Sequence, residues 1–355
     1  MMADLFQGIY RNRSVFLTGH TGFKGTWMLR WLTMLGADVT AFSLSNEHRS
    51  PLKPATGSAP KREYLDDIRN ADALRTAVLS AQPEIVFHFA AQAIVRRSYI
   101  DPAGTVATNV TGTANLLDAC RRCESVQGIV VVTSDKCYRN NEWDWGYREN
   151  DPLGGRDTYS ASKSCAEIVA ESFRLSFPEI ANLATCRSGN IVGGGDWSED
   201  RLVPDLMRNA VAGETTFLRM PDATRPWQHV LDPLYGYLLL GQKFLEDRET
   251  EQYAGAWNFG PDAEGNLSVG DVADRMAKYW DKIKFRNAEA TGPHEARLLM
   301  LDAAKARTRL GWTPVWKIDE TIRRTVEWYR EYAESGTDLT ERQITEYRLL
   351  RSAKR

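Results

Sequence analysis

The sequence reads Thr18-Gly19-His20-Thr21-Gly22-Phe23-Lys24-Gly25 directly after the apolar run Val15-Phe16-Leu17, and an amphipathic helical pattern begins after Gly22. Glycines between a strand and a helix permit a tight turn and a close approach of the backbone to a ligand. The N-terminus of the helix then faces a pyrophosphate group. Three glycines alone are a weak signal, but their place between a predicted strand and a predicted helix favours a dinucleotide-binding turn over a purely structural one.

The first half of the chain alternates short apolar runs with helical patterns. After the first strand, the apolar runs cover residues 38–44, 84–90, 128–134 and 183–191. Each run is short and almost continuously apolar, which is typical of strands that are covered on both faces of a parallel sheet. The alternation therefore predicts an α/β fold with a doubly wound parallel sheet, a Rossmann fold.

Beyond Gly193-Gly194-Gly195 the alternation weakens, and shorter helical segments with longer loops follow. We predict a Rossmann domain over residues 1–190, with a return segment around residues 225–240 that rejoins the main sheet. A smaller mixed α/β lobe over residues 191–335 would bind the substrate at the carboxyl edge of the sheet. Residues 336–355 are expected to form a charged helix, to which the sequence assigns no role.

Composition excludes several classes of partner. The 45 basic and 47 acidic side chains nearly cancel, and no long basic stripe lies outside the C-terminal tail, so we expect no nucleic-acid partner. No apolar stretch reaches the ~20 residues of a membrane span, and the N-terminus lacks the apolar segment of a secretory signal. The five cysteines include one CxxC, Cys120 and Cys123, without a second pair, so we expect no metal site. A cytoplasmic protein without a membrane partner is the expectation.

A second motif pairs a tyrosine with a lysine. Tyr159 and Lys163 lie four residues apart, which places them on one face of a helix. A nearby ammonium and a positively charged nicotinamide would favour the phenolate and lower the pKa of Tyr159. Such a tyrosine can remove a proton from a sugar hydroxyl while hydride leaves the same carbon. The YxxxK spacing is common by chance, so its value lies in following the glycine loop and the polar run Thr133-Ser134-Asp135-Lys136.

In this order the motifs resemble the extended short-chain dehydrogenase/reductase family of sugar-nucleotide enzymes, from Val15 to about Tyr329. Further matches are Asp66-Asp67-Ile68, His88-Phe89-Ala90-Ala91-Gln92 and Arg187-Ser188-Gly189-Asn190. The resemblance implies a nicotinamide cofactor and a set of residues that contact or border it. These residues are Gly19, His20, Thr21, Gly22, Phe23, Lys24, Gly25, Asp67, Ile68, Ala90, Ala91, Gln92, Asn109, Thr133, Tyr159 and Lys163.

The choice between NAD and NADP depends on the end of the second strand. An acidic residue is expected there to bind the adenosine ribose, and Ser43 stands at that position instead. Arg49 is near in sequence and could approach a 2′-phosphate. We expect NAD and leave NADP as the alternative.

The segment after the fifth strand distinguishes reactions within the family. The resemblance implies small residues there in epimerases and two ionisable residues in 4,6-dehydratases, and this chain carries Asp135 and Lys136. The local stretches 19–25, 134–138, 193–197 and 225–230 are similar to the family members that dehydrate CDP-glucose. Members that act on dTDP-glucose carry glutamate in place of the lysine. Two departures from the pattern precede the tyrosine, where Arg156 and Thr158 replace an expected histidine and proline.

The resemblance implies a lyase that releases water. Oxidation at sugar C4 makes a ketone, which acidifies the C5 proton; a base removes that proton, an acid protonates the departing C6 hydroxyl, and hydride returns to C6. We expect Tyr159 to oxidise C4 while Ser134 holds its oxygen. Lys136 would be the base, in a neutral form favoured by desolvation, and Asp135 the acid, with a pKa raised by burial. The alternative is that Asp135 and Lys136 form an exposed ion pair of little consequence.

The nucleotide end of the substrate requires cationic and amide donors for its diphosphate. Asn190, Arg201 and Arg225 are the candidates, and the resemblance adds His294 and Glu295 near the nucleotide. The leading hypothesis is a dehydratase of CDP-glucose, and the alternatives are a 4,6-dehydratase for another nucleotide-glucose, a nucleotide-sugar 4-epimerase and a non-catalytic NAD-binding regulator.

A homodimer or homotetramer is expected from the family, whose members commonly pair through two long helices. The corresponding segments here cover residues 105–120 and 160–176. Leu116, Leu117 and Ile168 would serve such a contact or the core of the subunit equally well.

Overall fold

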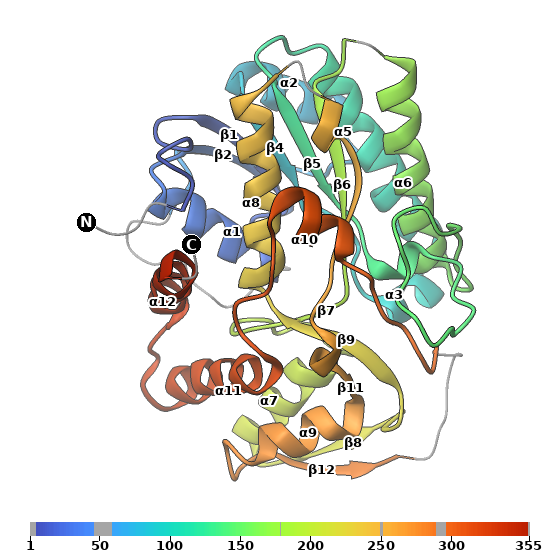
Figure 1. Ribbon diagram of the computed structural model, residues 1–355, viewed down its shortest axis with the longest axis vertical. Coiled ribbons are helices and arrows are strands. Elements are labelled where there is room, and N and C mark those ends of the chain that lie inside the picture. The colour runs from blue at the N-terminus through green and yellow to red at the C-terminus, as the bar shows by residue number, and fades with distance from the viewer. Residues whose placement is uncertain (1–4, 46–58, 178, 249–250, 289–295, 354–355) are drawn as a thin grey trace.

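The structure is a computed structural model that describes residues 5–45, 59–177, 179–248, 251–288 and 296–353 (Figure 1). Its centre is a sheet of seven parallel strands in the order β10-β6-β5-β4-β1-β2-β3. The strands are β1 Ser14–Thr18, β2 Asp38–Ser43, β3 Arg62–Leu65, β4 Ile85–His88, β5 Gly128–Val132, β6 Asn182–Ser188 and β10 Gly255–Phe259. The predicted doubly wound parallel sheet is therefore confirmed.

Helices cover both faces of the sheet, because alternate strand residues point to opposite sides. Val15 and Leu17 join one hydrophobic cluster, whereas Phe16 between them joins the other. The first face is covered by α1 Phe23–Met34 and α8 Leu231–Glu246. The second face is covered by α2 Ala71–Ala81, α5 Gly112–Arg121 and α6 Thr158–Ser176.

A smaller lobe lies beyond the carboxyl edge of the sheet, at the lower end of the molecule in Figure 1. It contains a three-stranded sheet in the order β11-β9-β7 and a two-stranded sheet of β12 and β8. The strands are β7 Asn190–Val192, β8 Thr215–Leu218, β9 Thr224–His229, β11 Asn266–Ser268 and β12 Lys284–Asn287. The helices of this region are α7 Leu202–Ala212, α9 Val269–Ala277 and α11 Ile318–Ser335, whereas α10 Ala304–Leu310 packs beside β10 of the main sheet.

One sequence prediction about strands needs correction. The apolar run 183–191 is two strands, β6 in the main sheet and β7 in the lobe, separated at Gly189. A Cβ at Gly189 would lie 2.4 Å from Cγ of Pro226, so only glycine lets β9 approach this closely. The predicted return of residues 225–240 to the main sheet takes the form of a helix: α8 packs on the sheet, β9 stays in the lobe, and β10 adds the seventh strand.

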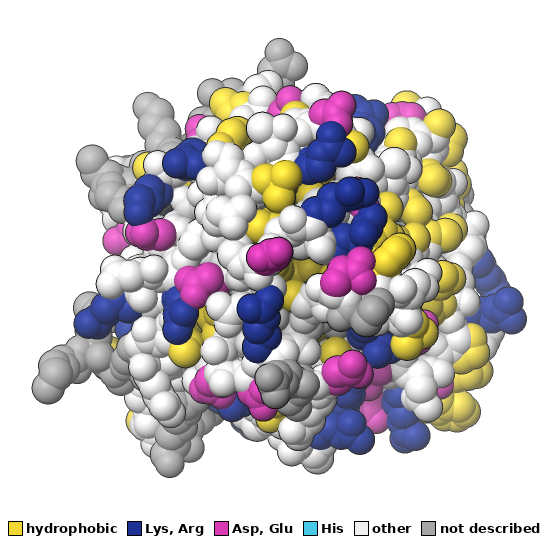
Figure 2. All heavy atoms as spheres, turned by 90° about the horizontal axis from the view of Figure 1, so that it is seen from above, with side chains coloured by type: hydrophobic (Ala, Val, Ile, Leu, Met, Phe, Trp, Pro, Cys, Tyr) yellow, Lys and Arg dark blue, Asp and Glu magenta, His cyan; other side chains and the backbone are white. Residues whose placement is uncertain are grey.

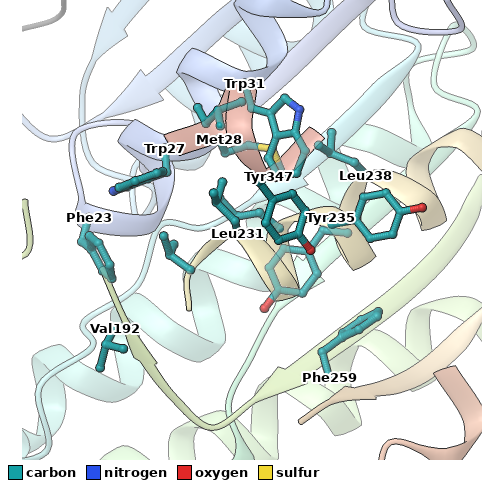
Figure 3. Packing of buried hydrophobic residues seen from close by; sticks show 14 of the residues in the cluster. Phe23, Trp27, Met28, Trp31, Val192, Leu231, Tyr235, Leu238, Phe259 and Tyr347 are labelled. Atoms are coloured by element: carbon teal, nitrogen blue, oxygen red, sulfur yellow. The ribbon is translucent and has the colours of Figure 1, made fainter. Parts of the chain in front are cut away.

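The helix α12, Thr340–Ala353, carries the predicted charges but is also part of the core. Its Tyr347 packs edge-on against Trp31 of α1, with ring centroids 5.6 Å apart (Figure 3). The Tyr347 hydroxyl donates a hydrogen bond of 2.9 Å to Oδ1 of the buried Asp232 in α8. In the part of the chain that the structure describes, no helix is both long and apolar enough to span a bilayer.

Candidate active site

The glycine loop after β1 has the geometry that a phosphate-binding turn requires. Gly19 has φ of +74°, and a Cβ there would lie 2.6 Å from the backbone nitrogen of Ala90. A Cβ at Gly25 would lie 2.0 Å from the carbonyl oxygen of Gly19. Gly22 caps α1 without a side chain, so the backbone N–H groups of the first helical turn are available to an anion. This cradle fits the pyrophosphate of a dinucleotide.

The loop after β4 lies beside the glycine loop, and hydrogen bonds to Thr18 and Asn109 hold it in place. The amide of Ala90 donates to Oγ1 of Thr18 at 3.2 Å, and the amide of Gln92 donates to Oδ1 of Asn109 at 2.8 Å. Nδ2 of Asn109 donates to Oγ of Ser162 in α6 at 2.9 Å. Asn109, predicted to border the cofactor, is a buried link between this loop and α6 in the structure.

Residues predicted to bind the adenosine lie at the carboxyl ends of β2 and β3. Ser43 is buried at the end of β2, and Asp67 follows β3, where Arg69 forms a 2.6 Å ion pair with it. Hydrogen bonding from Arg69 lowers the pKa of Asp67. Ile68 is packed in the core. Nε2 of His20 lies 2.7 Å from Oε1 of Glu63 on β3. Arg49 lies outside the described residues.

The five predicted catalytic residues, Ser134, Asp135, Lys136, Tyr159 and Lys163, line one cavity of about 370 Å³, together with Lys24 of the glycine loop. Strand β5 ends at Val132, and the short 3₁₀ turn η3, Asp135–Cys137, follows it. Oγ of Ser134 caps this turn by accepting from the amide of Lys136 at 3.2 Å, and it donates to Oδ1 of Asp135 at 3.0 Å.

Burial sets the protonation of the catalytic groups. It raises the pKa of Asp135, as expected for an acid that must carry a proton. Burial lowers the pKa of Lys163 to about 8, although Glu167 opposes this shift, and it lowers the pKa of Lys24 to about 7. For Tyr159, burial raises the pKa to about 12, although the hydrogen bond with Ser134 and the charge of Arg201 lower it. The lower pKa expected from the sequence for Tyr159 included a positively charged nicotinamide beside it; in the protein alone, desolvation outweighs the neighbouring cations.

The predicted substrate-binding residues Asn190, Arg201 and Arg225 line the same cavity. Arg201 donates to Oδ2 of Asp196 at 3.0 Å and to the carbonyl oxygen of Ala93 at 3.1 Å. Arg225 is only 5% exposed and donates to the carbonyl oxygen of Ala296 at 2.5 Å. His294 and Glu295, also predicted for the nucleotide, lie outside the described residues.

The cavity contains a charged cluster that the sequence did not indicate. Asp200 accepts from Arg96 at 3.1 Å and from Arg219 at 3.0 Å, and all three residues line the cavity. Arg96 belongs to α3, Val95–Ile100, whereas Arg219 follows β8, so no spacing rule connects them. These two arginines form a second cationic site in the cavity. A diphosphate can replace the Asp200 carboxylate there as the anion that the arginines bind.

Comparison with known proteins gives relatives over nearly the whole chain. A CDP-glucose 4,6-dehydratase of Salmonella typhimurium is 42% identical over 96% of this chain and 98% of its own. A dTDP-glucose 4,6-dehydratase of Streptomyces antibioticus is 32% identical over 78% of this chain and 79% of its own. A probable dTDP-glucose 4,6-dehydratase of Sinorhizobium fredii is 28% identical over 89% and 93%.

Solved structures share the fold at lower identity. A UDP-glucose 4-epimerase of Thermotoga maritima with UDP-glucose superposes with a TM-score of 0.76 at 20% identity, covering 90% of this chain and 99% of its own. A UDP-glucose 4-epimerase of Thermus thermophilus in complex with NAD gives a TM-score of 0.75 at 23% identity, covering 89% and 98%. Residues 16–325 also match the family model described as GDP-mannose 4,6 dehydratase. The chain therefore belongs to the GDP-mannose 4,6 dehydratase family.

Proposed function

We propose that this enzyme converts CDP-glucose to CDP-4-keto-6-deoxyglucose and uses NAD as a tightly held redox cofactor. The observation that carries the proposal is the placement of Asp135 and Lys136 in one cavity with Tyr159 and Lys163. A C4 epimerase needs only the tyrosine and lysine pair, whereas water elimination needs a second acid and a base. The 42% identity with a CDP-glucose 4,6-dehydratase supports the same base and sugar.

The residues divide the reaction into oxidation and elimination. Tyr159 takes the proton from the C4 hydroxyl, and Ser134 donates a hydrogen bond to the C4 oxygen. Lys136 then removes the C5 proton, which the C4 ketone has made acidic. Asp135, whose pKa is raised by burial, delivers its proton to the departing C6 hydroxyl, which leaves as water. NAD, when bound, would supply a hydride acceptor for C4 and a hydride donor for C6. Lys136 returns its proton to C5 as the hydride reaches C6.

The two parts of the chain would hold the two ends of the reaction. We assign cofactor binding to residues 1–190, with the pyrophosphate in the glycine cradle of Gly19, Gly22 and Gly25. Residues 191–335 would hold the nucleotide end, with Arg201 and Arg225 on the diphosphate. Solved relatives of the same fold include complexes with NAD, which supports this choice of cofactor.

A test of the function measures loss of water from four substrates. The purified protein is incubated with CDP-, dTDP-, UDP- and GDP-glucose, with and without added NAD, and products are weighed by mass spectrometry. Loss of one water from CDP-glucose alone is the expected result. Loss from another nucleotide sugar would keep the mechanism and change the base. A product of unchanged mass with inverted C4 would make the enzyme an epimerase and contradict the roles of Asp135 and Lys136.

We also propose that the protein forms a homodimer through α6 and its neighbours. Figure 2 shows apolar side chains along the right-hand edge, the side on which α6 lies in Figure 1. Ile168 and Leu175 of α6 are 53% and 68% exposed, and α3 beside them leaves Tyr99 and Ile100 exposed. Leu116 and Leu117, by contrast, are fully buried within the subunit. Ile168→Asp should convert the dimer to a monomer in light scattering, whereas an unchanged mass would contradict this interface.

A further inference from the structure

A buried ion pair lies directly behind the catalytic residues. Nη2 of Arg187, on β6, lies 2.8 Å from Oε2 of Glu167, on α6, and both side chains are less than 5% exposed. Removing two charges from water is unfavourable, and a well-packed apolar pair is often as stable. A buried pair at this position therefore calls for a reason other than stability.

Glu167 joins the pair to the oxidation residues. It lies one helical turn beyond Lys163 and two turns beyond Tyr159 on the same helix. Its carboxylate accepts hydrogen bonds from Oγ1 of Thr133, the residue before Ser134, and from Oγ1 of Thr185 at 2.6 Å. The position of α6 relative to the ends of β5 and β6 is thus fixed at one carboxylate.

Arg187 joins the pair to the elimination residues. Its Nη1 donates to the hydroxyl of Tyr138 at 2.8 Å and to the carbonyl oxygen of Glu149 at 3.0 Å. The guanidinium also lies 4.9 Å from the centre of the Tyr138 ring. Tyr138 directly follows the turn η3, which carries Asp135 and Lys136. Any shift of Arg187 therefore moves the segment that presents the acid and the base.

A second cavity, of about 440 Å³, lies on the far side of the pair and is lined by Glu167, Arg187, Glu149 and Lys305. Thr133, which donates to Glu167, lines the active-site cavity instead. The ion pair lines this second cavity and reaches the active-site cavity through Thr133. Shortened side chains would enlarge the second cavity, so the test below uses replacements of similar length.

We infer that Glu167 and Arg187 form a positioning unit that holds the oxidation pair, Tyr159 and Lys163, in register with the elimination pair, Asp135 and Lys136. Both half-reactions then act on one bound sugar without movement of the chain between them. The inference rests on the proposed function for its two half-reactions, but the ion pair also has an effect that is independent of turnover. The Glu167 charge stabilises the protonated form of Lys163.

The titration of Lys163 provides this independent readout. The titratable groups that face it are Lys24 of α1, His88 of β4, Cys137 of η3 and Glu167 of α6. Burial lowers the pKa of Lys163 to about 8, while the carboxylate of Glu167 raises it. Removing that carboxylate must lower the pKa further, so Lys163 loses its proton earlier as the pH rises.

Glu167→Gln keeps the shape of the side chain and removes the charge. We expect NMR of labelled Lys163 in the variant to give a pKa below that of the wild type, with Glu167→Asp restoring most of the difference. We expect kcat to fall about 10²-fold, with the alkaline limb of the pH profile moved to lower pH and no accumulation of NADH, because oxidation itself is slowed. An unchanged Lys163 titration would overturn the electrostatic part of the inference.

Arg187→Lys keeps the charge and removes the forked contacts to Tyr138 and Glu149. We expect oxidation to proceed and elimination to lag, so the absorbance of NADH should build up in a single turnover where the wild type shows only a transient. Asp232→Asn is the matched control, since it exchanges another buried carboxylate far from the cavity, and thermal unfolding is followed for all variants. Activity losses that track only the loss of folded protein, with a wild-type NADH trace, would overturn the inference.

The two proposals fail in different ways. If the wild type releases no water from any nucleotide glucose, the proposed function fails, and the Lys163 titration in Glu167→Gln still decides the positioning unit. If the wild type dehydrates a nucleotide glucose and both variants keep its NADH trace and pH profile, only the positioning unit fails.

Discussion

The two walls of the active-site cavity are assembled in different ways. One wall presents Asp135 from the 3₁₀ turn η3 and Tyr159 from the first turn of α6, and both groups are buried. The facing wall presents Arg201, Arg219 and Arg225 from separate segments, and each arginine is already bonded to a carboxylate or a backbone oxygen. The reacting groups are thus fixed by local structure, whereas the recognition groups are brought together by the tertiary fold. Substitutions on the two walls should therefore differ in the kinetic parameter that they change, as well as in the size of the change.

The largest effect is expected at the centre of the catalytic wall. Tyr159→Phe removes the base for C4 oxidation and should lower kcat by about 10²–10⁴-fold. Affinity for NAD should stay near that of the wild type, because the ring is kept. Product formation by mass spectrometry and NAD binding by fluorescence titration measure the two quantities. Turnover at the wild-type rate would contradict the role of Tyr159.

Lys136→Met should separate the two half-reactions on the same wall. The C5 proton would lack its base, so we expect product formation to fall by about 10²-fold or more while NADH accumulates. Stopped-flow absorbance with CDP-glucose follows the reduced cofactor directly. If product formation falls without any rise in NADH, Lys136 acts in oxidation rather than in elimination.

The glycine cradle offers a matched pair of substitutions. Gly25→Ala places a Cβ 2.0 Å from the Gly19 carbonyl oxygen, whereas Gly22→Ala meets its nearest atom at 3.5 Å. Overpacking of this kind costs about 1–3 kcal/mol of folding free energy. We expect both variants to bind NAD more weakly, Gly22→Ala because its Cβ faces the pyrophosphate and Gly25→Ala because the loop is distorted, and only Gly25→Ala to unfold at a lower temperature. Wild-type NAD affinity in both variants would show that the cradle does not hold the cofactor.

On the recognition wall we expect a change in binding without a change in chemistry. Arg225→Gln removes the positive charge that would bind the diphosphate. KM for CDP-glucose should rise by about 10–100-fold, since hydrogen bonds to charged groups contribute about 1.5–3 kcal/mol. The value of kcat should change little, in contrast to Tyr159→Phe. Steady-state kinetics across a range of CDP-glucose concentrations test this, and a selective fall in kcat would move Arg225 to the catalytic wall.

The smallest effect concerns a buried carboxylate that belongs to neither wall. Burial raises the pKa of Asp232 to about 7, whereas an unfolded aspartate titrates near ~3.9. The stability contributed by this group is therefore present below about pH 4 and is lost as the pH rises through about 7. Asp232→Asn should make unfolding less dependent on pH and be about 1–3 kcal/mol more stable than the wild type near about pH 8. Urea unfolding at several pH values measures this, and an unchanged pH slope would contradict it.

The sequence predicted the catalytic wall better than the recognition wall for a physical reason. The glycine loop, the run from Thr133 to Lys136 and the YxxxK pair are each local patterns whose geometry follows from one turn or one helix. Arg96 and Arg219 meet at Asp200 only because α3 and β8 are brought together by the fold, and no spacing rule encodes that contact.

Glu167 is an intermediate case between local pattern and tertiary contact. It continues the spacing of Tyr159 and Lys163 by one further turn, so the pattern could have indicated it. Its partner Arg187 lies in a stretch already matched to the family, but its role depends on burial, which sequence does not give.

The strand prediction failed where the chain passes from the main sheet to the sheet of the smaller lobe. The run 183–191 is uniformly apolar, so periodicity alone cannot show that Gly189 lets the chain change sheets. Residues 231–246 are buried on nearly every side of α8, which removes the apolar stripe of 3.6-residue period that normally reveals a helix. The error at Gly189 marks the place where the chain passes from one sheet to the other.

The packing of α12 determines when the core beside α1 can be completed during translation. Tyr347 fills space beside Trp31 and bonds to Asp232, so the core next to the cofactor helix remains incomplete until residues 340–353 have left the ribosome. The dinucleotide-binding half is synthesised first, yet part of its apolar surface is covered by residues that are more than 300 positions downstream. That surface around Trp31 therefore stays incompletely covered until translation is almost complete.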